Sequence, residues 1–461
     1  MNHDSASCRV SVDGIAVIPR VMLRWSDLPG RRVGLYGLGV EGMASLRRCR
    51  ALDIDPVLVD DSPSAATDLG VLETSAGGLP ALAGCEVVIK SPGISRYGPV
   101  VSALRDAGVT VVGGLGLWLA GSDLSRVLVV TGTKGKSTTT SIAAHLLSAW
   151  GYRSLLAGNI GKPPYDPQVS EDYDYWVVEV SSYQATDLPV TPPVAAVTSL
   201  HPDHLPWHGG DPEIYYRDKL SALAQPGAEV TVANGDSALL RSHAELLGPR
   251  VRWVHAADDP DAAWMDALGL IGLHNRRNAL IAAESLRAMG IAEASDVSSL
   301  GLGAAGFVGL PSRLREVGRR SGVAFVDDNL STNVLPALAA VDAFPDRRVA
   351  LIVGGQSRGI DYAPLAVGLR SRVAPLVLVT VPTNGPDIHA QVAAAGAGPS
   401  VSIVDTTSLE QAVTMAAGWA EPDGVVLLSP AAPSFDLFRD YRARGEAFVA
   451  AMLACGGTPA Q

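Results

Sequence analysis

The chain has 461 residues, of which 47% are hydrophobic and 18% are charged, and its formal net charge is −11 at pH 7. This length predicts two to four domains, and the composition suits soluble globular domains with large cores. The acidic balance and the scattered lysines and arginines argue against a nucleic-acid-binding protein, which normally has a basic face. The four cysteines form no CxxC pair, so neither a zinc site nor a disulfide framework is expected, and a reducing cytoplasm fits. No apolar run reaches about 18 residues, so no membrane span is expected. The first ~20 residues lack a signal-peptide pattern and are expected to be a loosely ordered extension.

The first block of the chain follows the pattern of a dinucleotide-binding unit. A short apolar strand leads into the turn Gly37-Leu-Gly39-Val-Glu-Gly42, and a helical stretch and a second strand ending at Asp60 follow. In this context backbone N–H groups and the helix dipole are directed at a phosphate. Alone, the pattern predicts only a bound phosphate or nucleotide diphosphate. The expected elements are strands at 33–36, 56–60, 87–90 and 109–112 and a helix at 43–51.

The second block opens with the most informative motif of the chain. Residues 131–138 read Thr-Gly-Thr-Lys-Gly-Lys-Ser-Thr and follow the apolar run 126–130. A buried strand, a glycine turn and a Lys-Ser pair that opens a helix place N–H groups, a helix dipole, the Lys136 charge and a hydroxyl for Mg²⁺ around nucleotide phosphates. The two glycines are closer in sequence than in the standard P-loop. An ordinary glycine-rich turn is the less favoured alternative, because all parts of the motif occur in the right order.

Five further polar side chains of this block are candidates for chemistry. Glu179 ends an expected strand and is placed to hold Mg²⁺ beside the nucleotide, and a simple strand-end cap is the alternative. His204 also follows an expected strand, and it is either a metal ligand or a structural or surface histidine. Lys219 lies on an expected helix, where a solvated lysine is the plain alternative. Asn275 and Asn278 share one helix face, so they are expected to read an adenine, bind phosphate or cap the helix.

The third block begins near Pro311 and again alternates strands with helices, which indicates parallel sheets. We therefore expect an α/β fold with three domains in series. The first and last domains are expected to be Rossmann-like, and the central one to be a P-loop-type ATPase domain with a parallel sheet. The expected domains are 1–122, 123–310 and 311–461, with strands at 175–180, 194–199, 324–327, 348–353, 376–380 and 424–428 and helices at 336–342 and 408–420.

In combination, these segments resemble the Mur ligases, which are ATP-dependent, amide-forming enzymes of peptidoglycan synthesis. The resemblance extends from about Ser26 to Phe448 and is specific because many short motifs occur in one order. The motifs are Gly-Thr-Lys-Gly-Lys-Ser-Thr at 132–138, Gly158-Asn-Ile-Gly161, Glu179-Val-Ser-Ser-Tyr-Gln184, Asp203-His204, Lys219, Gly272-Leu-His-Asn275 through Asn278, Leu310-Pro-Ser-Arg313, Asp328 with Thr332-Asn333, Gly354-Gly-Gln-Ser-Arg358-Gly, Leu427-Leu-Ser-Pro430, Ser434-Phe-Asp436 and Arg444-Gly-Glu446.

The resemblance implies ATP and two Mg²⁺ ions as cofactors, with Lys136, His204 and Lys219 as catalytic residues. The implied nucleotide contacts are Gly132, Thr133, Lys134, Gly135, Lys136, Ser137, Thr138, Asn275, Asn278, Arg313 and Asp328. The implied metal ligands are Ser137, Glu179, His204 and Lys219, the last carried as a carbamate. The implied contacts to UDP-sugar and amino acid are Gly37, Gly39 and Gly42 against the diphosphate, Asp60 near the uridine, Asn159 on the sugar substrate, and Thr332, Arg358, Ser434 and Tyr441.

The small first block and the ending Ser-Pro-x-x-x-Ser-Phe-Asp-x-Phe resemble the branch that adds glutamate to UDP-N-acetylmuramoyl-L-alanine. Several positions depart from the common D-glutamate pattern: Lys134 replaces an asparagine, Leu330 a lysine, Ser312 a histidine and Arg358 a lysine. The Gly-x-Glu-Gly form at 39–42 and the Ser-Ser-Tyr-Gln segment are instead similar to the branch that adds L-glutamate, whose product a partner epimerase inverts. A lost lysine and a forked arginine fit a differently posed carboxylate. The sequence therefore favours L-glutamate, with D-glutamate as the alternative.

Other functions are less favoured. A folylpolyglutamate synthetase-like ligase shares the central chemistry, but the glycine fingerprint of the first block argues against it. A nicotinamide dehydrogenase would leave the loop at 132–138 without a role. A non-catalytic homologue that binds UDP-sugar and ATP is not indicated, because Lys136, Glu179, His204 and Lys219 are all present. The expected partners are small molecules only, with no nucleic acid and no membrane span, and the expected location is the cytoplasm.

Overall fold

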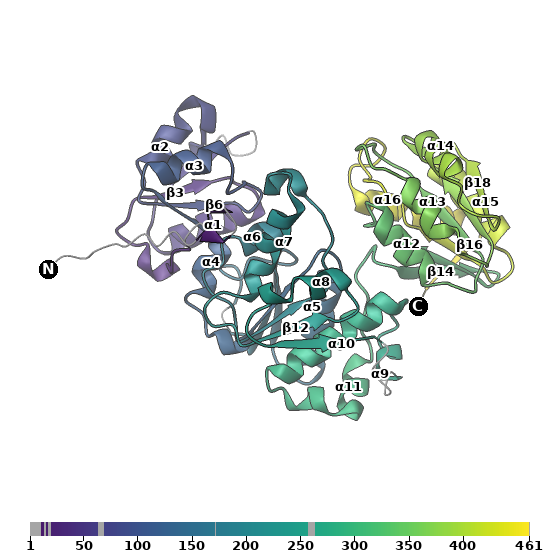
Figure 1. Ribbon diagram of the computed structural model, residues 1–461, viewed down its shortest axis with the longest axis horizontal. Coiled ribbons are helices and arrows are strands. Elements are labelled where there is room, and N and C mark those ends of the chain that lie inside the picture. The colour runs from purple at the N-terminus through teal and green to yellow at the C-terminus, as the bar shows by residue number, and fades with distance from the viewer. Residues whose placement is uncertain are drawn as a thin grey trace. The chain divides into compact units, whose positions relative to one another are not determined.

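A computed structural model of the chain describes residues 11–12, 15–16, 20–62, 69–170, 172–256 and 263–460. The chain forms two compact units: residues 1–258 with 280–303, and residues 259–279 with 304–461. The first unit contains two of the larger sheets and the second unit contains the third (Figure 1). Among the described residues, no helix is both long enough and apolar enough to cross a bilayer. A short antiparallel pair, β1 Ser11–Val12 and β2 Ile15–Ala16, lies near the N-terminus, where the expected extension falls largely outside the described residues.

The first sheet of unit one is parallel and has the strand order β5-β4-β3-β6-β7. Chain order reverses between β3 and β6, and such a switch point leaves a crevice at the carboxyl ends of the strands. Buried residues of α1 and α4 pack on one face, and those of α2 and α3 pack on the other. The elements are β3 Val33–Tyr36, α1 Val40–Ala51, β4 Val57–Asp60, β5 Leu72–Glu73, α2 Leu79–Ala83, β6 Val87–Lys90, α3 Pro99–Asp106, β7 Thr110–Gly113 and α4 Gly114–Leu119.

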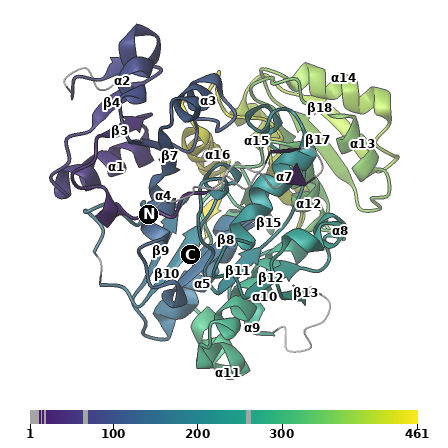
Figure 2. The same ribbon diagram turned by 60° about the vertical axis from the view of Figure 1, so that its left-hand side comes forward.

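The second sheet of unit one is also parallel, with the order β13-β12-β11-β8-β10-β9 (Figure 2). Its first strand in the chain, β8, lies between β10 and β11, so the loop after β8 opens between the ends of both neighbours. All five side chains of β8 are buried, as expected for a central strand of a parallel sheet. The elements are β8 Val127–Thr131, α5 Lys136–Ala149, β9 Ser154–Gly158, β10 Tyr175–Glu179, α6 Ser182–Ala185, β11 Val194–Val197, α7 Pro212–Leu220, β12 Val230–Asn234, α8 Ala238–Ser242, β13 Val251–Val254, α9 Ala263–Asp266, α10 Leu273–Ala288 and α11 Val297–Ala304, and α9 and the start of α10 belong to unit two.

The sheet of unit two has the order β18-β17-β16-β19-β15-β14-β20, and β14 is antiparallel to both of its neighbours. Buried residues of α12, α13 and α14 pack on one face and those of α15 and α16 on the other, which makes a doubly wound layer structure (Figure 1). The elements are β14 Arg315–Arg320, β15 Val323–Asp327, α12 Val334–Asp342, β16 Val349–Val353, α13 Ala363–Leu369, β17 Leu376–Thr380, α14 Gly385–Ala395, β18 Val401–Asp405, α15 Leu409–Ala420, β19 Val425–Leu428, α16 Tyr441–Ala454 and β20 Thr458–Pro459.

The expected α/β fold with parallel sheets is confirmed, and the expected strands occur within one or two residues of their predicted bounds. The sequence reading missed β5, β9, β12, β13 and β18, and it missed the antiparallel edge formed by β14 and β20. β9 carries only part-buried side chains over most of its length. The division into domains at 122/123 and 310/311 remains a prediction. The first two expected domains share one continuous hydrophobic core, which explains why they form a single compact unit.

Candidate active site

The phosphate loop after β8 is formed as the motif predicts. Gly132 and Gly135 both have positive φ values, 135° and 91°, and α5 begins directly at Lys136. A Cβ on Gly132 would clash with the Thr198 hydroxyl, so only glycine lets the loop pass this close to β11. The Lys136 ammonium donates to the carbonyls of Gly132 (2.9 Å) and Thr133 (3.2 Å), which holds its charge over the loop. Ser137 and Thr138 are buried in the first turn of α5, where the helix dipole favours an anion.

Lys219 reaches this loop from the last turn of α7. Its side chain is only 2% exposed, and its Nζ donates to the Gly132 carbonyl at 3.1 Å. The alternative of a solvated helix lysine is therefore wrong. Burial, together with the nearby Lys136 charge, moves the pKa of Lys219 well below that of a free lysine. Two lysine side chains thus converge on one carbonyl oxygen, and Lys219 is held in conditions that favour its neutral amine.

Glu179, at the end of β10, is buried and has one oxygen without a protein partner. The Asn159 side-chain amide donates to Oε1 at 2.6 Å, whereas Oε2 has no hydrogen-bond partner among the described residues. A buried carboxylate oxygen that accepts nothing is costly unless a cation or a ligand meets it. Within the described part of the chain, no three His, Cys, Asp or Glu side chains gather as a metal site. Mg²⁺ needs no such cage, because it is commonly held by one or two carboxylates, water and substrate phosphates.

His204 and Lys134 meet at Asp203, beside the loop. His204 has a left-handed backbone (φ 51°), and its side chain is 58% exposed. Lys134 Nζ lies 3.3 Å from the Asp203 carboxylate, which also lies 3.7 Å from His204 Nε2. Partial burial lowers the pKa of His204, and the neighbouring lysine charges lower it further against the opposing effect of Asp203. A neutral imidazole is the form that binds a metal ion or accepts a proton.

The first sheet holds its glycine turn very tightly. A Cβ on Gly42 would clash with the Gly37 carbonyl, and the same carbonyl accepts a 2.7 Å bond from Ser91 Oγ, so the turn and the loop after β6 meet at the switch point. Asp60 accepts N–H bonds from Leu38 (2.7 Å) and Ser62 (2.9 Å). Asp60 therefore shapes the turn through its own carboxylate, and its expected place near a uridine remains a prediction, as do the expected substrate roles of Gly39 and Asn159.

A polar network that the sequence reading missed joins the first sheet to the second. Glu41, in the first turn of α1, accepts from the Gln184 amide at 2.8 Å and from the Tyr165 hydroxyl at 3.3 Å. Burial raises the pKa of Glu41 to about 7. Nearby, the buried Lys90 ammonium lies 2.6 Å from the Asp187 carboxylate. Two of these residues, Glu41 and Gln184, lie in the Gly-x-Glu-Gly and Ser-Ser-Tyr-Gln segments, so the motifs were the available signal.

The residues of unit two that are expected to bind the nucleotide lie in two places: Asn275 and Asn278 on α10, and Arg313 and Asp328 next to β14 and β15. The Asn278 amide donates to Asn275 Oδ1 at 3.2 Å, which confirms that the two share one face of α10. Asp328, after β15, accepts from Ser429 Oγ at 2.7 Å, and this bond links the ends of β15 and β19. Burial raises the pKa of Asp328 to about 7, and the Arg313 charge opposes that rise. Nucleotide binding by these four side chains remains a prediction.

Arg444 organises the carboxyl end of this second-unit sheet. Its side chain is 2% exposed and donates to the carbonyls of Asn329 (3.2 Å), Gly354 (3.1 Å), Ala432 (3.0 Å) and Pro433 (3.4 Å) and to Asn329 Oδ1. Burial lowers the pKa of Arg444 to about 10, so the guanidinium stays charged at neutral pH. The motif Arg444-Gly-Glu446 marked this residue in the sequence but gave it no role. One guanidinium thus ties together the loops after β15, β16 and β19.

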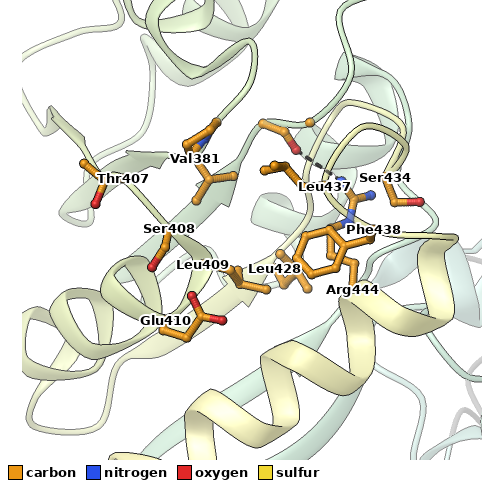
Figure 3. Close-up of a pocket in the computed structure, with 13 residues that line it drawn as sticks. Val381, Thr407, Ser408, Leu409, Glu410, Leu428, Ser434, Leu437, Phe438 and Arg444 are labelled. Atoms are coloured by element: carbon orange, nitrogen blue, oxygen red, sulfur yellow. Dashed lines mark hydrogen bonds between the residues drawn. The ribbon is translucent and has the colours of Figure 1, made fainter.

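A cavity of about 270 Å³ lies beside Arg444 (Figure 3). Thr407, Ser408 and Glu410 border it on one side, and Ser434, Phe438 and Arg444 border it on the other. Among the expected amino-acid contacts, Ser434 is buried in this wall, Thr332 and Tyr441 are half-buried, and Arg358 is exposed. Arg358 Nε donates to Gln356 Oε1 at 3.2 Å and its guanidinium lies 5.7 Å from the centre of the Phe435 ring. Their contacts to a substrate remain predictions.

Comparison with known proteins identifies the class. The model of the Mur ligase middle domain matches residues 130–267, and that of the Mur ligase glutamate ligase domain matches residues 312–432. The chain belongs to the Mur ligase family, whose members are ATP-dependent ligases that form amide bonds.

Two relatives are similar over nearly the whole chain. A UDP-N-acetylmuramoyl-L-alanine–L-glutamate ligase of Micromonospora sp. is 40% identical, over 95% of this chain and 100% of the relative. A protein of the same name from Salinispora tropica is 39% identical, over 94% of this chain and 100% of the relative. Among solved structures, the MurF ligase of Thermotoga maritima in complex with ADP has a TM-score of 0.55 at 14% identity, covering 95% of this chain and 97% of that chain. The fold is therefore that of a Mur ligase over its full length, first block included.

Proposed function

We propose that the chain joins L-glutamate to UDP-N-acetylmuramoyl-L-alanine at the expense of ATP, through an acyl-phosphate intermediate. The observation that carries this proposal is the convergence of Lys136 and Lys219 on one carbonyl of a phosphate loop beside the half-satisfied carboxylate of Glu179. That arrangement suits phosphoryl transfer, and the near-full-length similarity to L-glutamate ligases supports the substrates.

In the first step, the terminal carboxylate of the UDP-substrate attacks the γ-phosphorus of ATP, and the bond to ADP breaks. Lys136 and the N–H groups at the start of α5 hold the phosphoryl oxygens and offset their charge. In the second step, the glutamate amine attacks the acyl carbon, and phosphate leaves from the tetrahedral intermediate. The carbonyl clamp of Arg444 keeps the loops of unit two in place for the incoming amino acid.

The residues present fit a bound Mg²⁺. Glu179 Oε2 is buried and lacks a partner among the described residues, and Ser137 and His204 offer an oxygen and a nitrogen ligand near the loop. Bound there, the metal supplies charge neutralisation for the phosphate oxygens. We also propose that Lys219 is carbamylated: its neutral amine attacks the carbon of CO₂, a C–N bond forms and one proton leaves to solvent. The resulting carbamate anion replaces a poorly placed buried cation next to Lys136 by a favourable opposite charge.

The preference for L-glutamate rests on the cationic groups of unit two. Leu330 and Arg358 stand where the common D-glutamate pattern has lysines. L-glutamate and D-glutamate differ in the configuration of the α-carbon. If the amine faces the acyl phosphate in both, a carboxylate or the α-hydrogen must take a different position. A carboxylate buried in a new position needs a new hydrogen-bond donor. The forked guanidinium of Arg358 provides such a donor, and its N–H groups lie in different positions from those of a lysine ammonium.

The test uses purified protein with ATP, Mg²⁺, UDP-N-acetylmuramoyl-L-alanine and either D- or L-glutamate, and measures phosphate release. We expect release only when the UDP-substrate and an amino acid are both present, and at least ~10-fold higher kcat/KM for L-glutamate. Efficient use of D-glutamate alone would overturn the substrate and leave the ligase reaction in place. NAD(P)-linked turnover without ATP would overturn the reaction itself.

A product that carries L-glutamate requires a further enzyme wherever the D-configuration is needed. We therefore propose a functional link to an epimerase that inverts the new residue of the product. Since ATP and UDP-linked sugars are made inside the cell, we place the reaction in the cytoplasm.

A further inference from the structure

A cleft with three arginines in its wall lies on unit one, and the phosphate loop does not line it. It has a volume of about 250 Å³ and is bordered by β7, the edge strand of the first sheet, and by Thr186 and Asp187 just after α6. Three arginines border it: Arg20, Arg96 and Arg105. Neither the glycine turn nor the phosphate loop contributes to its wall, so the reaction proposed above does not use it.

Each of the three guanidinium groups is held by one backbone carbonyl. Arg20 donates to Leu188 at 2.8 Å, Arg96 to Thr186 at 2.6 Å and Arg105 to the Arg96 carbonyl at 3.0 Å. Arg96 is only 6% exposed, and its Nε–H has no acceptor among the described residues. A guanidinium has five N–H donors in a fixed fork, so most of the donors in this cleft are not used by the described protein groups.

The carboxylates nearest to the cleft, Asp187 and Asp218, act on these arginines, but each has a closer partner of its own. Asp187 is already paired with the Lys90 ammonium at 2.6 Å, and Asp218 accepts from Tyr97 (2.8 Å) and from His208 (2.7 Å). Within the described ranges, none of the three arginines has a carboxylate within ion-pair distance. Burial lowers the pKa of Arg20 to about 10, and the Arg96 charge adds to that effect, against the opposing charges of Asp187 and Asp218. The Arg96 charge acts on Arg105 in the same way.

We propose that this cleft is a binding site for a phosphate-class oxyanion. Three converging guanidinium groups favour a tetrahedral dianion over a monocarboxylate, because the former brings more negative charge and more acceptor oxygens to the same forks. The volume suits a phosphate group rather than a whole nucleotide. Arg96 and Arg105 lie in the loop after β6 and in α3, beside the first sheet, whereas Thr186 follows α6 beside the second sheet. An anion here would therefore also connect the two parts of unit one.

The test is isothermal titration calorimetry of the full-length protein with inorganic phosphate in a chloride buffer of constant ionic strength. We expect saturable binding with a dissociation constant on the order of 1 mM. Arg105→Gln should weaken it at least ~10-fold, equivalent to about 1.4 kcal/mol, and Arg105→Lys should weaken it less, since the charge remains and the fork is lost. Arg250→Gln is the matched control and should not alter binding. The Arg250 side chain is 69% exposed and lies just before β13, an edge strand of the second sheet.

Phosphate can also bind at the phosphate loop, and Lys136→Ala separates the two sites. Binding that survives Lys136→Ala and is lost in Arg105→Gln supports the cleft. Binding that is lost in Lys136→Ala and unchanged in Arg105→Gln overturns it, as does acetate binding as tight as phosphate binding. A parallel titration with glycerol phosphate distinguishes the two possible ligands. If glycerol phosphate binds more tightly than inorganic phosphate, the ligand is the phosphoryl group of a metabolite. If it binds more weakly, the ligand is the free phosphate ion. The titration contains no ATP or UDP-substrate, so its outcome is independent of the proposed reaction.

Discussion

Arg444→Met tests whether one guanidinium holds the catalytic loops of unit two. The substitution keeps most of the aliphatic volume and removes every donor. Four buried carbonyls, those of Asn329, Gly354, Ala432 and Pro433, then lose a charged partner. A hydrogen bond to a charged group is worth about 1.5–3 kcal/mol, but the bonds of one group are not additive and water enters part of the space. We therefore expect a loss of about 3–5 kcal/mol in the free energy of unfolding of unit two, the range for breaking a buried charged network.

The measurement is scanning calorimetry, because a protein with two compact units need not unfold in one transition. In a unit of this size, ~1 kcal/mol shifts the melting temperature by about 2–4 °C, so the transition of unit two should fall by roughly 6–20 °C. The transition of unit one should remain in place. Arg442→Met, two residues earlier on α16 and exposed, is the control and should change stability by no more than about 0.5 kcal/mol. A loss below about 1 kcal/mol for Arg444→Met would refute the clamp.

Three further predictions concern unit one. Lys136→Ala should lower kcat by about 10²–10³-fold, since a preorganised cation at the phosphates is lost, and a steady-state assay that finds more than half the activity contradicts this role. Lys219→Ala should be inactive and partly restored by a short carboxylate or by bicarbonate; unchanged activity, or an unmodified Lys219 in a fully active enzyme by mass spectrometry, counts against the carbamate. For Glu41, burial raises the pKa from 4.5 to about 7, so its stabilising contribution is complete below pH 4.5 and is lost as pH rises through 7. Glu41→Gln keeps an acceptor for the Gln184 amide. At about pH 8 its free energy of unfolding, measured with urea, should exceed that of the wild type by up to about 3 kcal/mol. If the free energy of unfolding depends on pH in the same way in both proteins, the raised pKa of Glu41 is wrong.

The sequence predicted the elements that repeat a simple pattern. The loop at 131–138 is local: strand, glycines and Lys136 follow one another, so its conformation could be inferred without the rest of the chain. The burial of Lys219 could not be inferred, because the helix 212–220 reads as polar. Only its packing against α6 and the contact of Lys219 with the loop after β8 show which side is covered. The Arg444 clamp joins groups more than 100 residues apart, and the chain pattern around Arg444 gives no sign of its partners.

The charges around the phosphate loop favour one kind of ligand. The Lys136 ammonium attracts an anion, whereas the buried Glu179 carboxylate repels one and has an oxygen that lacks a partner among the described residues. A nucleotide without a metal satisfies Lys136 and worsens the position of Glu179, and a cation alone does the opposite. A metal–nucleotide complex would meet both requirements, because it carries positive and negative charge together. We therefore propose that the nucleotide binds to this site together with its cation.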